Sequence, residues 1–481
     1  MTLSSDNFQD QINEPTDPPG ETLTGAQPAA RTVPLRRFFR LPRTFASLRH
    51  RNFRLFVSGQ FVSLTGTWVQ GAALSWLIYE LTQSKEQLGL IQGLRTFPVM
   101  LLSLYGGVMA DRHSRHRIVV VTQTLSMILA LMLALLVFQE MVAVWHIILI
   151  TIAFGAIHAF DIPARHSFVV EMVGEEDLTN AIALNSSVFN AARVIGPALA
   201  GIMMVAAGAA ACFLINGLSY IAVIVGLVMM RFSRPAEVQE KPEQSSAWKQ
   251  VTEGFGIVLR HPKVRRLLTL DVVVGMFGAS YAVLMPVFAS DILLTNESGF
   301  GFMLSATGLG ALCGALVVAN LRNKERAPYY MFAGMLMLCA NMMIFAWAHH
   351  IGPVAGGVVE NIFGARAVSS GILKSIVENA DFCVAVVSLA GVGMGLLLLL
   401  STINGAIQSS VSNSVRGRVM GEWSFAYVGS VPMGSLLIGF TAERIGAPEA
   451  VTANAVICLT AGLYVILKML KNRQVETLNR V

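Results

Sequence analysis

The chain has 481 residues, of which 54% are hydrophobic and 13% charged, whereas soluble domains carry roughly 25% charged residues. Twelve spans of about 20 residues would take roughly 240 residues, which leaves chain for short loops, a linker and two tails but excludes a large soluble domain. The formal net charge is +6. Because the basic residues are distributed along the chain as membrane topology requires, this charge does not indicate a nucleic-acid partner.

Residues 1–50 are expected to form a cytoplasmic tail. The first thirty contain five carboxylates and no Lys or Arg, together with several Pro, Gly and Thr, which is typical of disorder. A cleavable signal peptide would place basic residues first and an apolar run next, whereas eight arginines follow the acidic part here, between Arg31 and Arg54. We therefore predict a disordered and then basic tail rather than a signal peptide.

Twelve apolar runs bounded by charged or turn residues predict twelve transmembrane helices. They lie near 55–79, 88–110, 117–138, 145–163, 180–206 and 210–230, and then near 267–289, 300–320, 329–348, 384–410, 417–440 and 450–470. The predicted fold class is an all-α membrane protein with two six-helix bundles. Its parts are bundles at 51–231 and 265–470, a cytoplasmic linker at 232–264 and a cytoplasmic tail at 471–481.

Lys and Arg are concentrated in alternate loops, which orients the chain because basic segments resist translocation. After the N-terminal tail, the basic side contains Arg112, Arg115, Arg117, eight Lys or Arg from Arg231 to Arg266, Arg322, Lys324, Arg326, Arg416, Arg418, Lys468, Lys471 and Arg473. The opposite side contains Lys85, Arg366, Lys374 and Arg444. Both termini and the linker are therefore predicted to be cytoplasmic.

The two halves resemble each other weakly, as parallel repeats in transporters do. Residues 52–56 align with 264–268, and 110–112 with 320–322 at an offset of 210, but Gly196-Pro197 aligns with Val431-Pro432 at 235. The change in offset predicts an insertion at about 349–383, on the periplasmic side between spans 9 and 10. It could be a lid, a partner surface, a decorative loop or a membrane-dipping segment.

The loop after the second span reads GGVMADRHSRHR over residues 106–117. Adjacent glycines let two helices approach closely, and Asp111 can accept hydrogen bonds from a neighbouring helix N-terminus. Gly107, Asp111, Arg112 and Arg115 resemble the Gly-x-x-x-Asp-Arg-x-x-Arg signature of the major facilitator superfamily. The resemblance implies gating of a conformational change, and the alternative is that the arginines serve only topology.

The fifth span contains RVIGPALAG over residues 193–201. This segment looks like the Gly-Pro-x-x-Gly-Gly motif of the antiporter branch of the superfamily, from which it departs at Ala192 and Ala200. Gly196 and Pro197 form a bendable, closely packed point. They belong either to the conformational gate or to an ordinary kinked transmembrane helix.

Four further segments carry a narrower resemblance: DIPAR at 161–165, VEMV at 170–173, LTNAIALN at 178–185 and VRGRVMGE at 415–422. Together they resemble the subfamily of enterobactin exporters and related multidrug or secretion effectors over roughly residues 48–470. The insertion departs from the short loop usual there. The resemblance implies two bundles that rock around a midplane cavity, a monomer, and export by proton antiport.

Ionisable residues inside a span are costly, so each is a site hypothesis. Asp161 and Arg165 end the fourth span, where pairing with each other or with Arg112 would hold an outward-open state. Static anchoring of the loop is the alternative.

Arg95 and Arg193 should face protein or a water-filled cavity, where they would bind an anionic substrate or form internal ion pairs. Asp271, Glu422, His158 and Asp161 are candidates for exchanging a coupling proton, with structural roles as the alternative. The resemblance places spans 1, 4, 7 and 10 around the cavity. The candidate residues that line this cavity are Gln60, Trp68, Gln70, Asn404 and Gln408, together with Arg95 and Arg193. For the first five, a role in helix packing is the alternative.

No P-loop lysine motif, zinc-ligand spacing or nucleophile elbow is present in the sequence. The five cysteines lie in apolar stretches without paired or metal-ligand spacing. We therefore expect no enzymatic activity, no cofactor and no metal.

The predicted function is export of a drug-like compound or siderophore across a bacterial inner membrane, with protons as the coupling ion and the lipid bilayer as surroundings. An importer or uniporter of a small solute is an alternative within transport. A non-transporting receptor or assembly partner on the same fold is an alternative from another class, motivated by the insertion.

Overall fold

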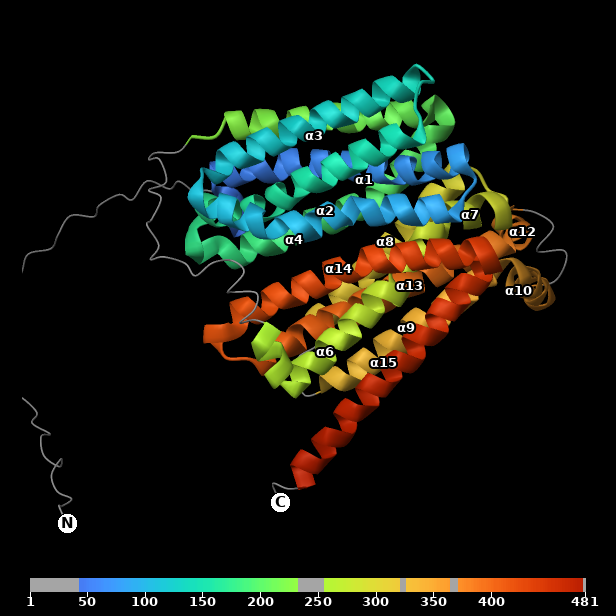
Figure 1. Ribbon diagram of the computed structural model, residues 1–481. Coiled ribbons are helices and arrows are strands. Elements are labelled where there is room, and N and C mark those ends of the chain that lie inside the picture. The colour runs from blue at the N-terminus through green and yellow to red at the C-terminus, as the bar shows by residue number, and fades with distance from the viewer. Residues whose placement is uncertain (1–42, 232–254, 321–325, 364–370, 479–481) are drawn as a thin grey trace, which may run out of the picture. The chain divides into compact units, whose positions relative to one another are not determined.

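The computed structural model describes residues 43–231, 255–320, 326–363 and 371–478 (Figure 1). These residues are almost entirely helical, and no strand occurs among them. The expected acidic tail, most of the linker and the loop with Arg366 lie outside the described residues.

The first half consists of a short 3-10 helix and four long helices: η1 Arg43–Arg49, α1 Arg51–Thr82, α2 Lys85–Arg112, α3 Arg115–Phe138 and α4 Val144–Val228. α4 is broken at Gly174 and Gly208, whose φ values of 71° and 76° belong to a conformation that residues with a Cβ rarely adopt. The two glycines divide α4 into a first segment at 144–173, a second at 175–207 and a third at 209–228. Spans four to six of the sequence prediction are these three segments.

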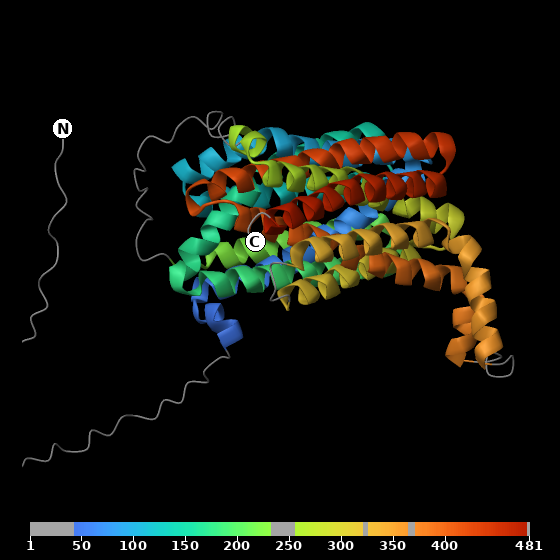
Figure 2. The same ribbon diagram turned by 90° about the horizontal axis from the view of Figure 1, so that it is seen from below.

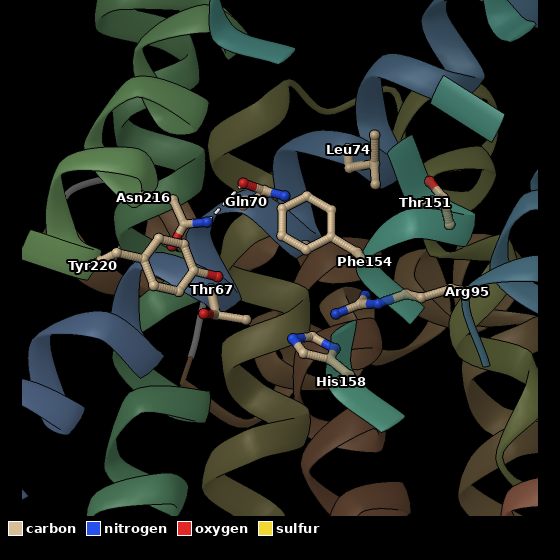
Figure 3. A pocket seen from close by; sticks show the side chains of 10 residues that line it. Thr67, Gln70, Leu74, Arg95, Thr151, Phe154, His158, Asn216 and Tyr220 are labelled. Atoms are coloured by element: carbon tan, nitrogen blue, oxygen red, sulfur yellow. Dashed lines mark hydrogen bonds between the residues drawn. The ribbon is translucent and has the colours of Figure 1, made fainter. Parts of the chain in front are cut away.

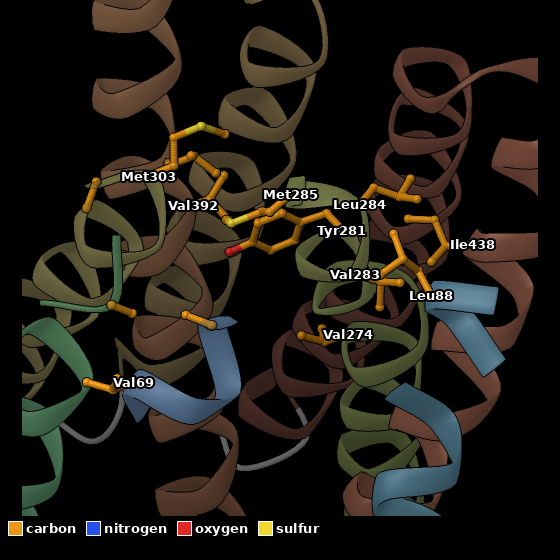
Figure 4. Close-up of a cluster of buried hydrophobic side chains, with 14 of the residues drawn as sticks. Val69, Leu88, Val274, Tyr281, Val283, Leu284, Met285, Met303, Val392 and Ile438 are labelled. Carbon is orange, nitrogen blue, oxygen red and sulfur yellow. The ribbon is translucent and has the colours of Figure 1, made fainter. Parts of the chain in front are cut away.

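The second half begins with a span from Pro262 to Ile292 that is regular only at its start. It comprises α6 Pro262–Val273, η2 Val274–Gly278, η3 Ser280–Leu284, α7 Met285–Val287 and η4 Phe288–Ile292. Pro286 lacks the N–H that a regular helix would use there, which contributes to this irregularity. Figure 4 shows Tyr281, Leu284 and Met285 of this span among buried side chains of other helices, such as Met303 of α8 and Val392 of α13.

The remaining helices are α8 Glu297–Ala319, α9 Ala327–Ala346, α10 Ala348–Phe363, α12 Gly371–Glu378, α13 Ala380–Ser410, α14 Asn413–Ile445 and α15 Ala447–Leu478. α15 thus continues beyond residue 470, where the sequence predicted the start of a tail. The insertion is a pair of helices, α10 and α12, that packs on α13 and runs across the direction of the long helices in Figure 2.

Nine helices of the described residues are long and apolar enough to cross a membrane, and the bent α2 makes a tenth. α4 counts only once in that number although Gly174 and Gly208 break it into three segments. The described residues therefore provide the twelve spans that the hydropathy pattern predicts.

The two halves meet along α2 with α14 and along the second segment of α4 with α8. A Cβ added at Gly301 would stand 2.4 Å from the carbonyl oxygen of Pro197, and one at Gly93 would stand 3.3 Å from that of Pro432. Gly93 and Gly301 are 208 positions apart, close to the repeat offset in this part of the chain. The two contacts are therefore related by the internal repeat.

Candidate transport site

The spans have two ends, named here by their turns: the Gln83 face, where α1 turns into α2, and the Arg112 face, where α2 turns into α3. At the Gln83 face, polar contacts join the halves. The Tyr79 hydroxyl on α1 donates to the Asp291 carboxylate. The Glu443 carboxylate on α14 accepts from the backbone N–H groups of Lys85 at 2.8 Å and Glu86 at 3.3 Å. Glu443 thus caps the N-terminus of α2, where the helix dipole favours negative charge.

Glycines let the helices of the two halves approach closely near the same face. A Cβ at Gly89 would stand 2.4 Å from the Ser435 carbonyl oxygen, and one at Gly439 would stand 2.6 Å from that of Lys85. These distances are shorter than any ordinary carbon–oxygen contact, and backbone atoms cannot move aside as a flexible side chain can. The Gln83 face is therefore the closed end of the two halves.

Towards the Arg112 face the surroundings are more open. Gly405, Gly417 and Gly421, on α13 and α14, each have open space where a Cβ would stand. Gln408 is exposed, and its amide donates to the Asn404 carbonyl oxygen at 2.5 Å. These two amides lie one turn apart on α13, away from the other expected cavity residues.

A small polar cavity lies inside the first half, between α1, α2 and α4 (Figure 3). Its volume is about 20 Å³, room for about one water molecule. Of the expected site residues, it brings together Gln70, Arg95 and His158. The side-chain oxygen of Gln70 accepts a 2.6 Å hydrogen bond from the side-chain amide of Asn216. The cavity also includes Thr67, Gly71, Leu74, Thr151, Phe154, Asn216 and Tyr220.

Arg193 lies between the halves. Its guanidinium carbon is 6.0 Å from the Trp68 ring centroid in a cation–π arrangement. It also lies near Tyr281 and Tyr427 of the second half. Gly308 of α8 packs on the Arg193 backbone, so this arginine lies at the contact of α4 with α8.

Asp271 on α6 is fully buried, and neither of its carboxylate oxygens has a hydrogen-bond partner among the described residues. The Trp423 indole of α14 approaches this carboxyl group without closing a hydrogen bond of ordinary geometry. Glu422, the neighbour of Trp423, is buried as well. Gln60 is buried on α1, and its side-chain oxygen also lacks a partner among the described residues.

At the Arg112 face, Asp161 is fully buried within the first half. It forms an ion pair with Arg165 one turn along the same helix. Its other oxygen accepts from the Thr122 hydroxyl at 2.8 Å and the Gln123 amide at 3.0 Å, both on α3. The pair therefore ties α4 to α3, and it is formed while the Gln83 face is closed.

The loop motif is arranged differently from the expectation at two points. Gly106, not Gly107, makes the close helix contact: a Cβ there would stand 2.1 Å from the Ala159 carbonyl oxygen, while Gly107 has open space. Asp111 caps no helix among the described residues. Its half-exposed carboxylate instead lies 3.9 Å from the guanidinium of Arg115, four residues further along the chain.

Arg115 instead links the loop to α4, since it pairs with Glu171 and donates to the Ala110 carbonyl oxygen at 3.2 Å. Arg112 is exposed. The motif thus contributes one inter-helix ion pair through Arg115.

Gly196 and Pro197 are buried at a junction of three helices. A Cβ at Gly196 would stand 2.4 Å from the Trp68 Cβ of α1, while the Pro197 carbonyl oxygen faces Gly301 of α8. The dipeptide therefore packs both within its own half and against the other half.

A family model described as a transmembrane secretion effector matches residues 42–359 and 362–480. The chain belongs to this family. The staphyloferrin A transporter of Staphylococcus aureus is 22% identical over 427 residues, which cover 88% of this chain and 98% of the relative. The enterobactin exporter EntS of Escherichia coli is 23% identical over 432 residues, which cover 88% and 93%.

Solved structures share the fold of this chain. An inward-facing bacterial homologue of the human lysosomal transporter Spinster has a TM-score of 0.62 at 13% identity, covering 89% of this chain and 97% of that one. An inward-facing bacterial homologue of ferroportin has a TM-score of 0.58 at 15% identity, covering 88% and 98%. The chain therefore has the major facilitator fold, and it is a multi-pass membrane protein of a family that transports small molecules.

The sequence did not predict several residues of this site. Tyr79, Asp291 and Glu443 stand at the ends of apolar runs, where charged and aromatic residues are common, so no local signal distinguished them. Asn216 and Tyr220 are polar residues inside an apolar span, which is the same signal that made Gln70 a candidate cavity residue.

Replacing Glu443 by alanine is expected to loosen the Gln83 face. Loss of the cap on α2 should cost about 1 kcal/mol, which corresponds to about a five-fold change in the population of the closed face. A cysteine at Ser435, which is buried against α2, should then react about five-fold faster with a water-soluble maleimide, as quantified by mass spectrometry of the labelled peptide. Glu80→Ala, which removes an exposed carboxylate near the same face, should leave the rate unchanged, and equal rates for both variants would contradict the cap.

Proposed function

We propose that this protein exports an anionic metal chelator of the siderophore class across the bacterial inner membrane, in exchange for protons. Similarity along the whole chain to the staphyloferrin A transporter and to EntS supports the substrate class. The direction of transport and the coupling ion are part of the proposal.

The observation that carries the proposal is a pair of arginines inside the spans without acidic partners. Among the described residues, no carboxylate lies within 4.0 Å of Arg95 or Arg193, although six ion pairs of other Lys or Arg side chains occur there. A cation in a span is costly unless it is paired or faces water. A substrate with carboxylates or catecholates would supply the missing negative charge, and Trp68 beside Arg193 would pack on its apolar parts.

The excess of Lys and Arg assigns the Arg112 face to the cytoplasm, which makes the closed Gln83 face periplasmic. In this orientation the present conformation would load substrate from the cytoplasm. Rocking of residues 51–231 against 265–470 would then separate α4 from α8 and α2 from α14 near the Gln83 face and open that face. Asp161 and Arg165 would act as an anchor of α3 to α4 in this scheme, since both members of the pair belong to the same half.

Proteoliposomes that contain a pH-sensitive dye would test this function. With a proton gradient imposed, hydroxycarboxylate and catecholate chelators should elicit substrate-dependent proton flux, and cationic drugs should not. Arg193→Gln should reduce the flux at least ten-fold, whereas Arg444→Gln, which removes an exposed arginine, should not. Flux with cationic drugs alone, or none with correctly folded protein, would contradict the proposal.

Asp271 is the proposed site of proton exchange, because charging an unpaired carboxyl group in a span is costly and its charge therefore depends on which side it faces. Asp271→Asn is expected to abolish proton-driven accumulation while substrate-for-substrate exchange stays within about two-fold of normal, since a neutral amide preserves the shape of the site. Radiolabelled counterflow and dye fluorescence would measure the two activities separately. If Asp271→Asn retains proton-driven accumulation, Glu422 or His158 would become the candidate.

A further inference from the structure

The inserted helix α10 has an apolar stripe that no described part of the chain covers. Ile351, Val354, Val358 and Ile362 are all exposed, Val354 at 68% and Ile362 at 70% of their surfaces. Their spacing of three, four and four residues places them on one side of a helix. An uncovered stripe of this kind on a soluble surface would be unfavourable.

A different side of α10 makes the intramolecular contacts. Gly352 and Gly356 are buried, and a Cβ at these positions would stand 2.4 Å from the Asp381 backbone and 3.3 Å from the Ala380 Cβ. Glu360 is exposed and lies about 200° around the helix from Val358. The helix is therefore held by a glycine side, with the apolar stripe and Glu360 on other sides.

Helices α10 and α12, together called the hairpin below, are connected to two spans at their membrane ends. α9 ends at Ala346 and α13 begins at Ala380, so α10 and α12 begin and end at the level of the Gln83 face. Trp347, between α9 and α10, is partly exposed, and its indole N–H donates to the Thr452 hydroxyl at 3.0 Å. Tryptophan is enriched at this depth because its ring is amphipathic.

The direction of the hairpin also matters. Figure 2 shows α10 and α12 running across the long helices and out past them at one end of the spans. Because the spans cross the bilayer, a helix that runs across them at their ends lies along the membrane surface.

The neighbouring surface has the mixed chemistry of a lipid interface. A cavity of about 490 Å³ lies between the chain before and within α8 and the segment from α12 into α13. Phe302 and Phe382 contribute apolar walls, while Asn296, Asn379 and Asp381 contribute polar ones. Phenyl rings beside amide and carboxylate groups match the boundary between acyl chains and headgroups.

We propose that α10 docks on the lipid leaflet that borders the Gln83 face, with Ile351, Val354, Val358 and Ile362 among the upper acyl chains and Glu360 towards water. The occupant is lipid because α10 follows directly on the end of a span and runs across the spans at that end, which is the level of the leaflet border. The hairpin is thus an interfacial anchor beside the closed face, independent of substrate and proton coupling.

Spin labels in proteoliposomes would test this docking. In a variant whose five native cysteines are replaced and which still sediments as a single folded species, labels would be placed at Val358→Cys, Ile362→Cys and Glu360→Cys. Collision with oxygen, which concentrates in lipid, relative to a water-soluble nickel complex should be at least five-fold higher at 358 and 362 than at 360. Equal ratios at all three positions would overturn the proposal. Protection of 358 from both reagents, relieved when fewer protein molecules occupy each liposome, would also overturn it and indicate a second copy.

A second measurement keeps the native cysteines. Val358→Trp and Glu360→Trp variants would be reconstituted with lipids brominated near the top of the acyl chains. The added fluorescence of Val358→Trp should be quenched at least two-fold more strongly than that of Glu360→Trp. Equal quenching would overturn the proposal even if the cysteine-free protein did not fold.

Discussion

Replacing Gly301 by valine is expected to open the Gln83 face and to reduce transport at least ten-fold. A Cβ at this position would stand 2.4 Å from the Pro197 carbonyl oxygen and 2.9 Å from the Gly201 Cα. Overpacking of this kind costs about 1–3 kcal/mol. Because the clash exists only while α4 and α8 are in contact, the cost falls on the closed conformation and shifts the population away from it.

Pulsed EPR between labels on the two halves at the Gln83 face would measure this shift as a longer distance in Gly301→Val. The matched control is Gly405→Val on α13, which has open space around its Cβ and should leave both the distance and transport unchanged. An unaltered distance in Gly301→Val would mean that the α4–α8 contact is not part of the working closed state.

Replacing Arg165 by leucine is expected to be the most destabilising single change at the Arg112 face. Asp161 would remain buried with its bonds to Thr122 and Gln123 but without its cation. Removing one member of a buried ion pair costs about 3–5 kcal/mol, because the remaining charge is uncompensated. The thermal midpoint of detergent-solubilised protein should therefore fall by several degrees.

A double variant separates this loss of charge balance from a loss of packing. Asp161→Asn combined with Arg165→Leu should recover much of the lost stability, because no unpaired charge remains. Lys374→Leu breaks an ion pair of the same spacing whose side chains are 53% and 61% exposed, so it should change stability by less than about 1 kcal/mol. If Arg165→Leu unfolds at the wild-type temperature, the bonds from α3 alone are sufficient for Asp161.

The spans and the family were accessible from the sequence because both depend on local properties. A run of about 20 apolar residues is long enough to cross the bilayer wherever it occurs, so the predicted spans from 55–79 to 450–470 correspond to helices or helix segments of the structure. The motif at 106–117 and the segments at 161–185 and 415–422 each consist of residues that are near neighbours in the sequence. The resemblance to secretion-effector transporters could therefore be recognised from the sequence, and it is confirmed by the family match. The change in repeat offset predicted an insertion at about 349–383, the part of the chain in which α10 and α12 lie.

The arrangement of the site depended on contacts between residues far apart in the chain. The sequence could not distinguish Gly106 from Gly107, because only the position of the Ala159 carbonyl oxygen makes one of them indispensable. Nor could it pair Tyr79 with Asp291 or the start of α2 with Glu443, since the partners lie 212 and 358 positions apart in the chain. The sequence by itself determined which segments enter the membrane, through the transfer free energy of each segment. Only the tertiary structure decided which faces of these helices meet, because that choice is made by close packing and by polar groups that find partners in another helix.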